Sequence, residues 1–235
     1  MPNIRYYKIC AVLVVIGSVI ALAANIVHPD LPAGVREAHA RIASRADWRP
    51  THGFIIVAAL LLSFGLAGVA SACRRSGSVV ERLALLSTII GASVVAVSIG
   101  IDGFAEKTVS DAWLNAAPGQ REQLLIAAMP LQLIHVGLFY VWAGIFWGVS
   151  FIFYGWAILE SRAFPAWFGS TAALGGIGVC IVTVAQYLGP HDSVEVALRV
   201  LLFVEILWTF ASGWFLWRLA PEVADPERLR VTTAT

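Results

Sequence analysis

Six long apolar blocks, separated by short charged segments, constrain the fold of this chain more than any other feature. They occupy about residues 9–28, 53–73, 83–101, 131–156, 167–188 and 198–219. Each block has at least about 19 residues, which is enough for a helix to cross a hydrocarbon core roughly 30 Å thick. A helix also satisfies its own backbone polar groups, as lipid requires. The sequence therefore predicts an all-α, polytopic membrane bundle of six transmembrane helices, with residues 1–235 forming a single domain.

The composition supports this class and excludes others. Hydrophobic residues make up 59% of the chain and charged residues 13%, and the mean hydropathy is +0.79. A soluble domain of this length needs far more polar surface, so the expected surroundings are a lipid bilayer. The chain has no basic patch of the kind that binds nucleic acid. Cys10, Cys73 and Cys180 have no paired spacing, which argues against a thiol-redox site.

The charges between the blocks predict the orientation. Nine of the 16 Lys and Arg residues fall on the side of the two termini, and seven fall on the opposite side. The positive-inside rule therefore places both termini in the cytoplasm. Arg5 and Lys8 before the first block also suggest a signal peptide, but the apolar run continues through Val27, so we expect an uncleaved helix. The start of the second block (Trp48 to His52) and the end of the third (Asp102-Gly103) resemble small bacterial membrane proteins. This resemblance implies a bacterial inner membrane and no particular activity.

Two connections carry structure of their own in this interpretation. Residues 35–46 are charged and rich in alanine, and they predict a short surface helix that ends before Pro50. In the connection 104–130, Pro118-Gly119 predicts a break, and Pro130 predicts the start of the next membrane helix.

Of the side chains in the membrane blocks, Glu205 has the highest free-energy cost of placement in lipid. A carboxylate at the centre of a membrane helix costs roughly 2.5 to 3.5 kcal/mol, so such a residue usually faces a bundle interior and has a function. Glu205, Thr209 and Ser212 share one helical face, which predicts that this face points inward. With the predicted topology, the other polar residues of the blocks gather in the outer half, and the cytoplasmic half lacks a comparable group. The polar residues expected in the outer half are His28, His39, His52, His135, His191, Asp102, Glu106, Gln132, Gln186 and Glu205.

These positions predict one pocket that is open toward the outside. We expect Glu205, Asp102, His135 and His52 to form its catalytic group. His28, His39 and His191, at block ends or in loops, are expected to be solvated or to cap helices, and Asp102-Gly103 could also simply end a helix. The residues expected to bind the substrate are Phe139, Trp142, Phe146, Trp208, Gln186 and Gln132.

The favoured function is acid–base chemistry on a lipophilic or isoprenoid-like molecule, of the isomerase, cyclase or lyase type. An apolar site would keep Glu205 protonated as a general acid, while Asp102, nearer to water, would remain ionised as a base. The aromatic side chains around Phe139 could stabilise a cationic intermediate. This interpretation needs no cofactor and no metal.

Three other functions are compatible with the same residues. His52 and His135 could ligate a haem from two helices, and Asp102 or Glu205 could join them around another metal, although no two ligands have metal-site spacing on one helix. A proton-coupled transporter could use Glu205 as its protonation site. A non-catalytic membrane subunit could use Glu205 to hold a partner helix.

Overall fold

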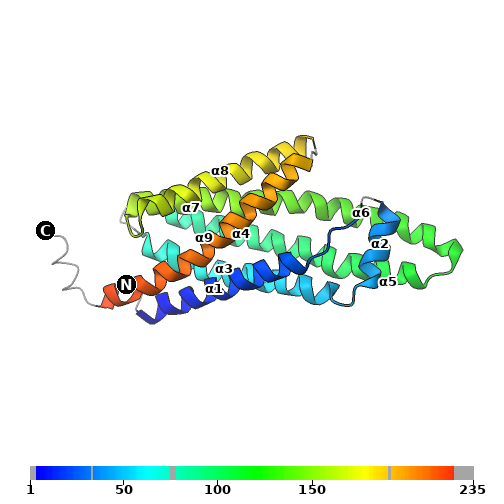
Figure 1. The fold of residues 1–235 in the computed structure, drawn as a ribbon, viewed down its shortest axis with the longest axis horizontal. Helices are drawn as coiled ribbons and strands as arrows, with labels where there is room; N and C mark the ends of the chain where they lie inside the picture. The colour runs from blue at the N-terminus through cyan, green and yellow to red at the C-terminus, as the bar shows by residue number, and fades with distance from the viewer. Residues whose placement is uncertain (1–3, 33, 75–77, 190–191, 225–235) are drawn as a thin grey trace, which may run out of the picture.

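The computed structural model is a bundle of long helices, as predicted (Figure 1). It describes residues 4–32, 34–74, 78–189 and 192–224, and these residues contain no strand. His191 lies outside the described residues. Of the nine basic residues counted on the side of the two termini, Arg75, Arg228 and Arg230 also lie outside them. The elements are α1 (Ile4–Val27), α2 (Val35–Ser44), α3 (Trp48–Ala72), α4 (Val80–Gly100), the π-helical η1 (Ile101–Glu106), α5 (Lys107–Asn115), α6 (Pro118–Trp142), the π-helical η2 (Ala143–Val149), α7 (Ser150–Ser161), α8 (Ala166–Leu188) and α9 (Asp192–Ala224).

Five continuous helical stretches among the described residues are long and apolar enough to cross a membrane. They are Ile4–Val27, Trp48–Ala72, Val80–Asn115, Pro118–Ser161 and Ala166–Leu188. The sixth expected helix, α9, packs along α1 and α8 and crosses the face of the bundle (Figure 1). The protein is therefore a multi-pass helical membrane protein.

The beginning of α1 and the end of α9 lie at the same end of the bundle (Figure 1). We call this the inner end and the opposite one the outer end. An even number of crossings requires this arrangement. That the inner end faces the cytoplasm stays a prediction from the distribution of charges.

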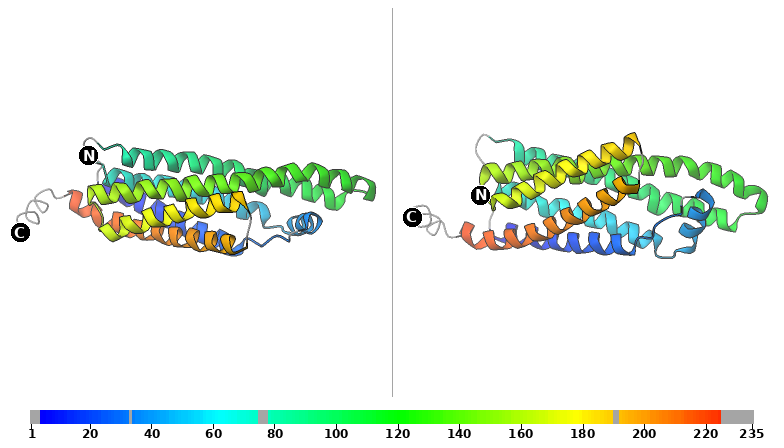
Figure 2. Two further views of the ribbon diagram at one scale, coloured as in Figure 1. Left: turned by 90° about the horizontal axis from the view of Figure 1, so that it is seen from above. Right: turned by 45° about the horizontal axis from the view of Figure 1, so that its top comes forward.

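Two stretches extend well beyond the blocks that the sequence suggested. Val80–Asn115 has 36 residues and Pro118–Ser161 has 44, or about 54 and 66 Å of helix. Both exceed a hydrocarbon core of about 30 Å, and their α5 and α6 parts project past the outer end as a helical hairpin (Figure 2). α2 packs against α5 there.

The prolines account for the differences in this region. The break predicted at Pro118-Gly119 lies just before these residues, at Ala116-Ala117. Pro118 is in the first turn of α6, where its missing N–H costs nothing, and Gly119 is already part of that helix. The expectation that Pro130 starts a helix is wrong, because Pro130 lies inside α6. The surface helix over residues 35–46 is present as α2, but it ends at Ser44, and Pro50 lies in the first turn of α3.

Candidate functional site

Asp102 lies at the outer end in η1, where the helix that begins as α4 widens to π geometry. Short π segments inside α-helices are rare and occur often at functional sites. Asp102 is 5% exposed, and its backbone carbonyl accepts a hydrogen bond from Trp48 Nε1 at 3.1 Å. The next residue, Gly103, contacts α3 so closely that a Cβ there would overlap His52. The glycine therefore allows the start of α3 to approach the carboxyl group of Asp102.

His52 is fully buried in the early turns of α3 and points at Asp102. Its Nδ1 is 2.7 Å from the carbonyl oxygen of Trp48, one turn earlier, and this contact requires an N–H that donates to the carbonyl. Its Nε2 is 2.9 Å from Asp102 Oδ2. The backbone contact fixes the imidazole so that Nε2 faces the carboxylate.

His135, on α6, reaches the same carboxylate oxygen from another side. Its Nε2 is 3.4 Å from Asp102 Oδ2. Its Nδ1 is 3.2 Å from the hydroxyl oxygen of Ser98, which lies on α4 one turn before Asp102. The side chain of His135 is 18% exposed, compared with 0% for His52. His135 is therefore the more accessible of these two imidazoles.

His28 completes the cluster, although the sequence analysis expected it to be solvated or to cap a helix. It follows α1 directly, and its Nε2 is 3.3 Å from His52 Nε2. Its ring packs edge-on against His52 and tilted against Trp48, with centroids 5.0 and 5.4 Å away. Burial lowers the pKa of His28, and the neighbouring His52 lowers it further, which favours the neutral imidazole. We call His28, His52, Asp102 and His135 the His–Asp centre.

Glu205 does not lie with the other three residues of the expected catalytic group. That group is therefore divided between two places in the bundle. Its side chain points from α9 at Gly175 of α8, where a Cβ would overlap the carboxyl group. Glu205 is 1% exposed, and its Oε1 has no hydrogen-bond partner among the described residues. The next polar residue on the same face, Thr209, bonds Ser18 of α1 at 2.8 Å. The polar face of α9 thus meets α1 and α8.

The aromatic residues that were expected to bind substrate also lie in different parts of the bundle. Phe139 and Trp142 lie on α6 inward of His135, with their ring centroids 5.0 Å apart. Phe146 packs against the backbone of α4 at Gly91. Trp208 stacks on Phe168 near the start of α8, with centroids 4.4 Å apart, and donates to the Phe168 carbonyl at 2.9 Å. Trp208 is therefore a packing residue far along α9 from the outer end.

The two glutamines that were expected to bind the substrate lie toward the outer end. Gln132 is half-buried on α6, three residues before His135. Gln186 is buried near the end of α8. Glu106, one turn beyond Asp102, was outside the expected catalytic group, yet it is 2% exposed and its Oε1 has no partner among the described residues. Its spacing of four residues from Asp102 is the signal that could have found it.

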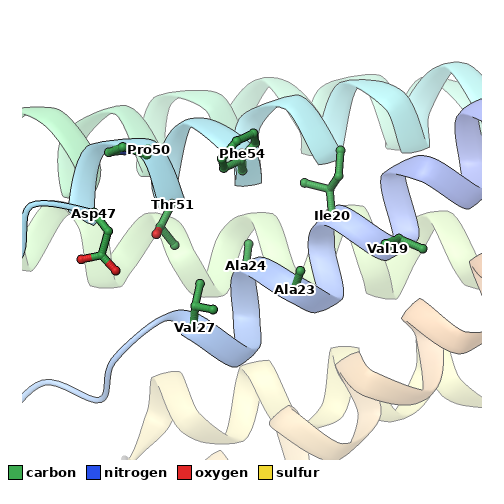
Figure 3. Close-up of a pocket in the computed structure, with 9 residues that line it drawn as sticks. All are labelled: Val19, Ile20, Ala23, Ala24, Val27, Asp47, Pro50, Thr51 and Phe54. Carbon is green, nitrogen blue, oxygen red and sulfur yellow. The ribbon is translucent and has the colours of Figure 1, made fainter.

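An apolar cavity of about 440 Å³ lies between the outer parts of α1 and α3 (Figure 3). Thr51 and Val27, two of its lining residues, directly precede His52 and His28, respectively, along the chain. Val19, Val27 and Phe54 on its walls are about half exposed, so the cavity opens toward the surface that faces lipid. The lining residues are Val19, Ile20, Ala23, Ala24, Val27, Asp47, Pro50, Thr51 and Phe54.

A second polar group lies farther out and holds α2 on the hairpin. His39 Nδ1 is 2.7 Å from the hydroxyl oxygen of Ser110 on α5, and both residues are buried. Lys107 forms an ion pair with Asp111 and donates to the Ala43 carbonyl at 3.0 Å. His39 is therefore buried rather than solvated. Burial lowers its pKa.

Comparisons with known proteins identify a family and assign no activity. No curated protein and no solved structure matches the chain. A family model described as a domain of unknown function (DUF4386) matches residues 7–219, which include every residue of the His–Asp centre and Glu205. The chain belongs to the DUF4386 family.

Proposed function

We propose that this protein is a membrane-embedded enzyme that carries out acid–base chemistry on a lipophilic molecule at the His–Asp centre. The observation that supports this proposal most strongly is the position of a buried carboxylate, Asp102, within hydrogen-bonding distance of two imidazoles. A carboxylate in an apolar bundle is costly. Imidazole is the side chain whose proton exchanges most readily near neutral pH. Such a group can take a proton from a bound molecule and return it elsewhere.

The roles of the residues follow from their exposure. His135 is the most accessible imidazole facing Asp102 and is the candidate for proton exchange with the substrate. His52, fixed by the Trp48 carbonyl, holds the carboxylate of Asp102 in place. This assignment replaces the expected acid–base pair of Glu205 and Asp102.

The cavity between α1 and α3 supports a lipophilic substrate. Its walls are mostly apolar, it opens toward lipid, and two of its lining residues, Val27 and Thr51, directly precede His28 and His52 along the chain (Figure 3). An acyl or isoprenoid chain could lie there with its polar end at the centre. The distribution of charges favours a site on the periplasmic side of a bacterial inner membrane.

Turnover in defined membranes tests the proposal. Purified protein would be reconstituted into vesicles made from a bacterial lipid extract, and lipid species would be compared by mass spectrometry before and after incubation. We expect the wild-type protein to convert at least one lipid species and Asp102→Asn to lower the rate on the order of 100-fold or more. Ser93→Ala is the control, because Ser93 is exposed on α4 and bonds only the carbonyl of Ile89. Equal turnover by wild type and Asp102→Asn would refute the assignment.

A second variant tests the cavity. Ala23 lines it with an exposed side chain, so Ala23→Trp should occupy the space without disturbing the packed core. We expect a raised KM for the lipid and a smaller effect on kcat. An unchanged KM would separate the cavity from substrate binding.

A further inference from the structure

The donors and acceptors of the His–Asp centre do not balance as hydrogen bonds when the imidazoles are neutral and Asp102 is ionised. His52 Nδ1 donates its proton to the Trp48 carbonyl at 2.7 Å, so in the neutral imidazole Nε2 carries a lone pair. That lone pair faces Asp102 Oδ2 at 2.9 Å and His28 Nε2 at 3.3 Å. A carboxylate oxygen is also an acceptor. Two acceptors at 2.9 Å repel one another unless a positive charge lies near both.

A proton on His52 is one source of this charge, because its Nε2–H would donate to Asp102 Oδ2 and face the lone pair of His28 Nε2. A metal ion is the other source. A cation bound to all three atoms satisfies each lone pair at once. The nitrogen and oxygen atoms of His28, His52 and Asp102 lie within 4.8 Å of one another.

The distances from His52 Nε2 to the other two ligand atoms are close to those in a metal site. Zinc binds imidazole nitrogen and carboxylate oxygen at about 2.0 to 2.2 Å in a tetrahedron, which places neighbouring ligand atoms about 3.3 Å apart. The observed separations are 3.3 Å between the two Nε2 atoms and 2.9 Å between His52 Nε2 and Asp102 Oδ2. Metal-binding histidines also commonly donate their other ring N–H to a carbonyl, as His52 does.

We propose that His28, His52 and Asp102 bind one divalent transition-metal ion, with zinc as the ion that fits an N₂O ligand set of this geometry. His135, 3.4 Å from Asp102 Oδ2, positions the carboxylate from outside the ligand set. Three protein ligands leave a fourth position for water or substrate, which is the pattern of catalytic zinc sites. An ion there would activate the bound water or polarise a substrate oxygen.

The metal site would also join three separate parts of the chain. His28 follows α1, His52 belongs to α3 and Asp102 belongs to η1. Their outer ends would be tied by metal–ligand bonds, so binding should stabilise the folded protein. A bound metal ion is a property separate from the proposed activity. Both the metal content and the stability can be measured without any substrate.

The first experiment measures metal in the purified protein. Wild type in detergent would be exposed to Zn²⁺, separated from free metal and analysed by mass spectrometry for elements. We expect about one zinc ion per chain and an occupancy at least about ten-fold lower for His28→Gln and for His52→Gln. His39→Gln is the matched control, since His39 is another buried histidine, bonded to Ser110 and outside the centre. Wild type without bound zinc, or equal loss in His39→Gln, would overturn the metal site.

A second experiment needs no variant and therefore does not depend on whether the variants fold. A chelator should lower the thermal midpoint of the wild-type protein, and zinc should restore it. Cobalt in place of zinc should give the visible absorption of tetrahedral Co²⁺. A thermal midpoint that neither chelator nor zinc changes, together with no cobalt spectrum, would leave a purely hydrogen-bonded centre and refute the proposal.

Discussion

Asp102 and Glu205 are both buried carboxylic residues of one membrane bundle, and their surroundings differ completely. Asp102 is reached by imidazoles from α3 and α6, and its backbone is bonded by Trp48. Glu205 lies against the backbone of Gly175, and its Oε1 has no partner among the described residues. The cost of burying a carboxyl group therefore does not by itself identify a site. The side chains that converge on the group identify it.

The largest expected effect is a difference in zinc affinity between variants of Asp102 and variants of Glu205. Asp102→Asn removes the charged ligand, so we expect zinc affinity to fall on the order of 100-fold or more. Glu205→Gln should leave the affinity unchanged, because Glu205 lies on α9 away from the ligands. Competition with a chromophoric chelator measures both. An equal loss in the two variants would contradict the comparison.

Two glycines closely contact a side chain: Gly103 contacts His52, and Gly175 contacts Glu205. Substitution of each glycine should distinguish the surroundings of Asp102 from those of Glu205 in a second way. Gly103→Ala and Gly175→Ala both introduce a Cβ where a neighbouring side chain lies, so each should destabilise the protein by about 2 kcal/mol. Only Gly103→Ala should also weaken zinc binding, since it displaces His52. Gly175→Ala should be rescued in a Glu205→Ala background. Thermal unfolding and metal titration check this pattern in Gly103→Ala, Gly175→Ala, Glu205→Ala and the Gly175→Ala/Glu205→Ala double variant.

Much of the fold follows from the sequence, because block length and hydropathy determine where a helix can lie in lipid. The hairpin of α5 and α6 was missed because hydropathy falls after Ile101, although the helix continues through η1. His52, Asp102 and His135 were predicted together because each lies at the outer end of a block. Periodicity showed that the Glu205 face of α9 points inward, but it could not show which helices that face meets. The close approach of His28 depends on how α1 and α3 pack.

Removal of the Glu205 carboxyl group, whose Oε1 has no hydrogen-bond partner among the described residues, should stabilise the protein if the group has no partner in function. Glu205→Met keeps the length of the side chain and removes its polar group, so we expect a gain of about 1 to 2 kcal/mol. The measurement is the thermal midpoint in detergent. A loss of stability, with Glu205→Gln behaving like wild type, would instead show that Glu205 has a bonding partner in the membrane.

The smallest expected effect concerns pH and the outer hairpin. Burial lowers the pKa of His39 below its usual 6.5, so below pH 6.5 the unfolded chain binds a proton that folded His39 does not. Stability should therefore be fully present above pH 6.5 and should decrease as the pH falls from there toward the lowered value, by at most about 1.4 kcal/mol per pH unit. Hydrogen exchange in α2 should report this decrease.

His39→Gln is the control for the pH effect. Because all other titratable groups are the same in both proteins, the contribution of His39 is the difference between wild type and His39→Gln. Identical pH dependence in the two proteins would show that His39 makes no contribution.

The π segment η1 holds about one residue more per turn than an α-helix, because its hydrogen bonds run from i to i+5. Deletion of one residue from η1 could therefore restore α geometry with little rotation of α5, and Ser110 and Lys107 would still face α2. Insertion of one residue into η1 has no such compensation and would turn α5 by about 100° about its own axis, which would move these two side chains away from α2. A one-residue deletion within Ile101–Glu106 should therefore be tolerated better than a one-residue insertion there.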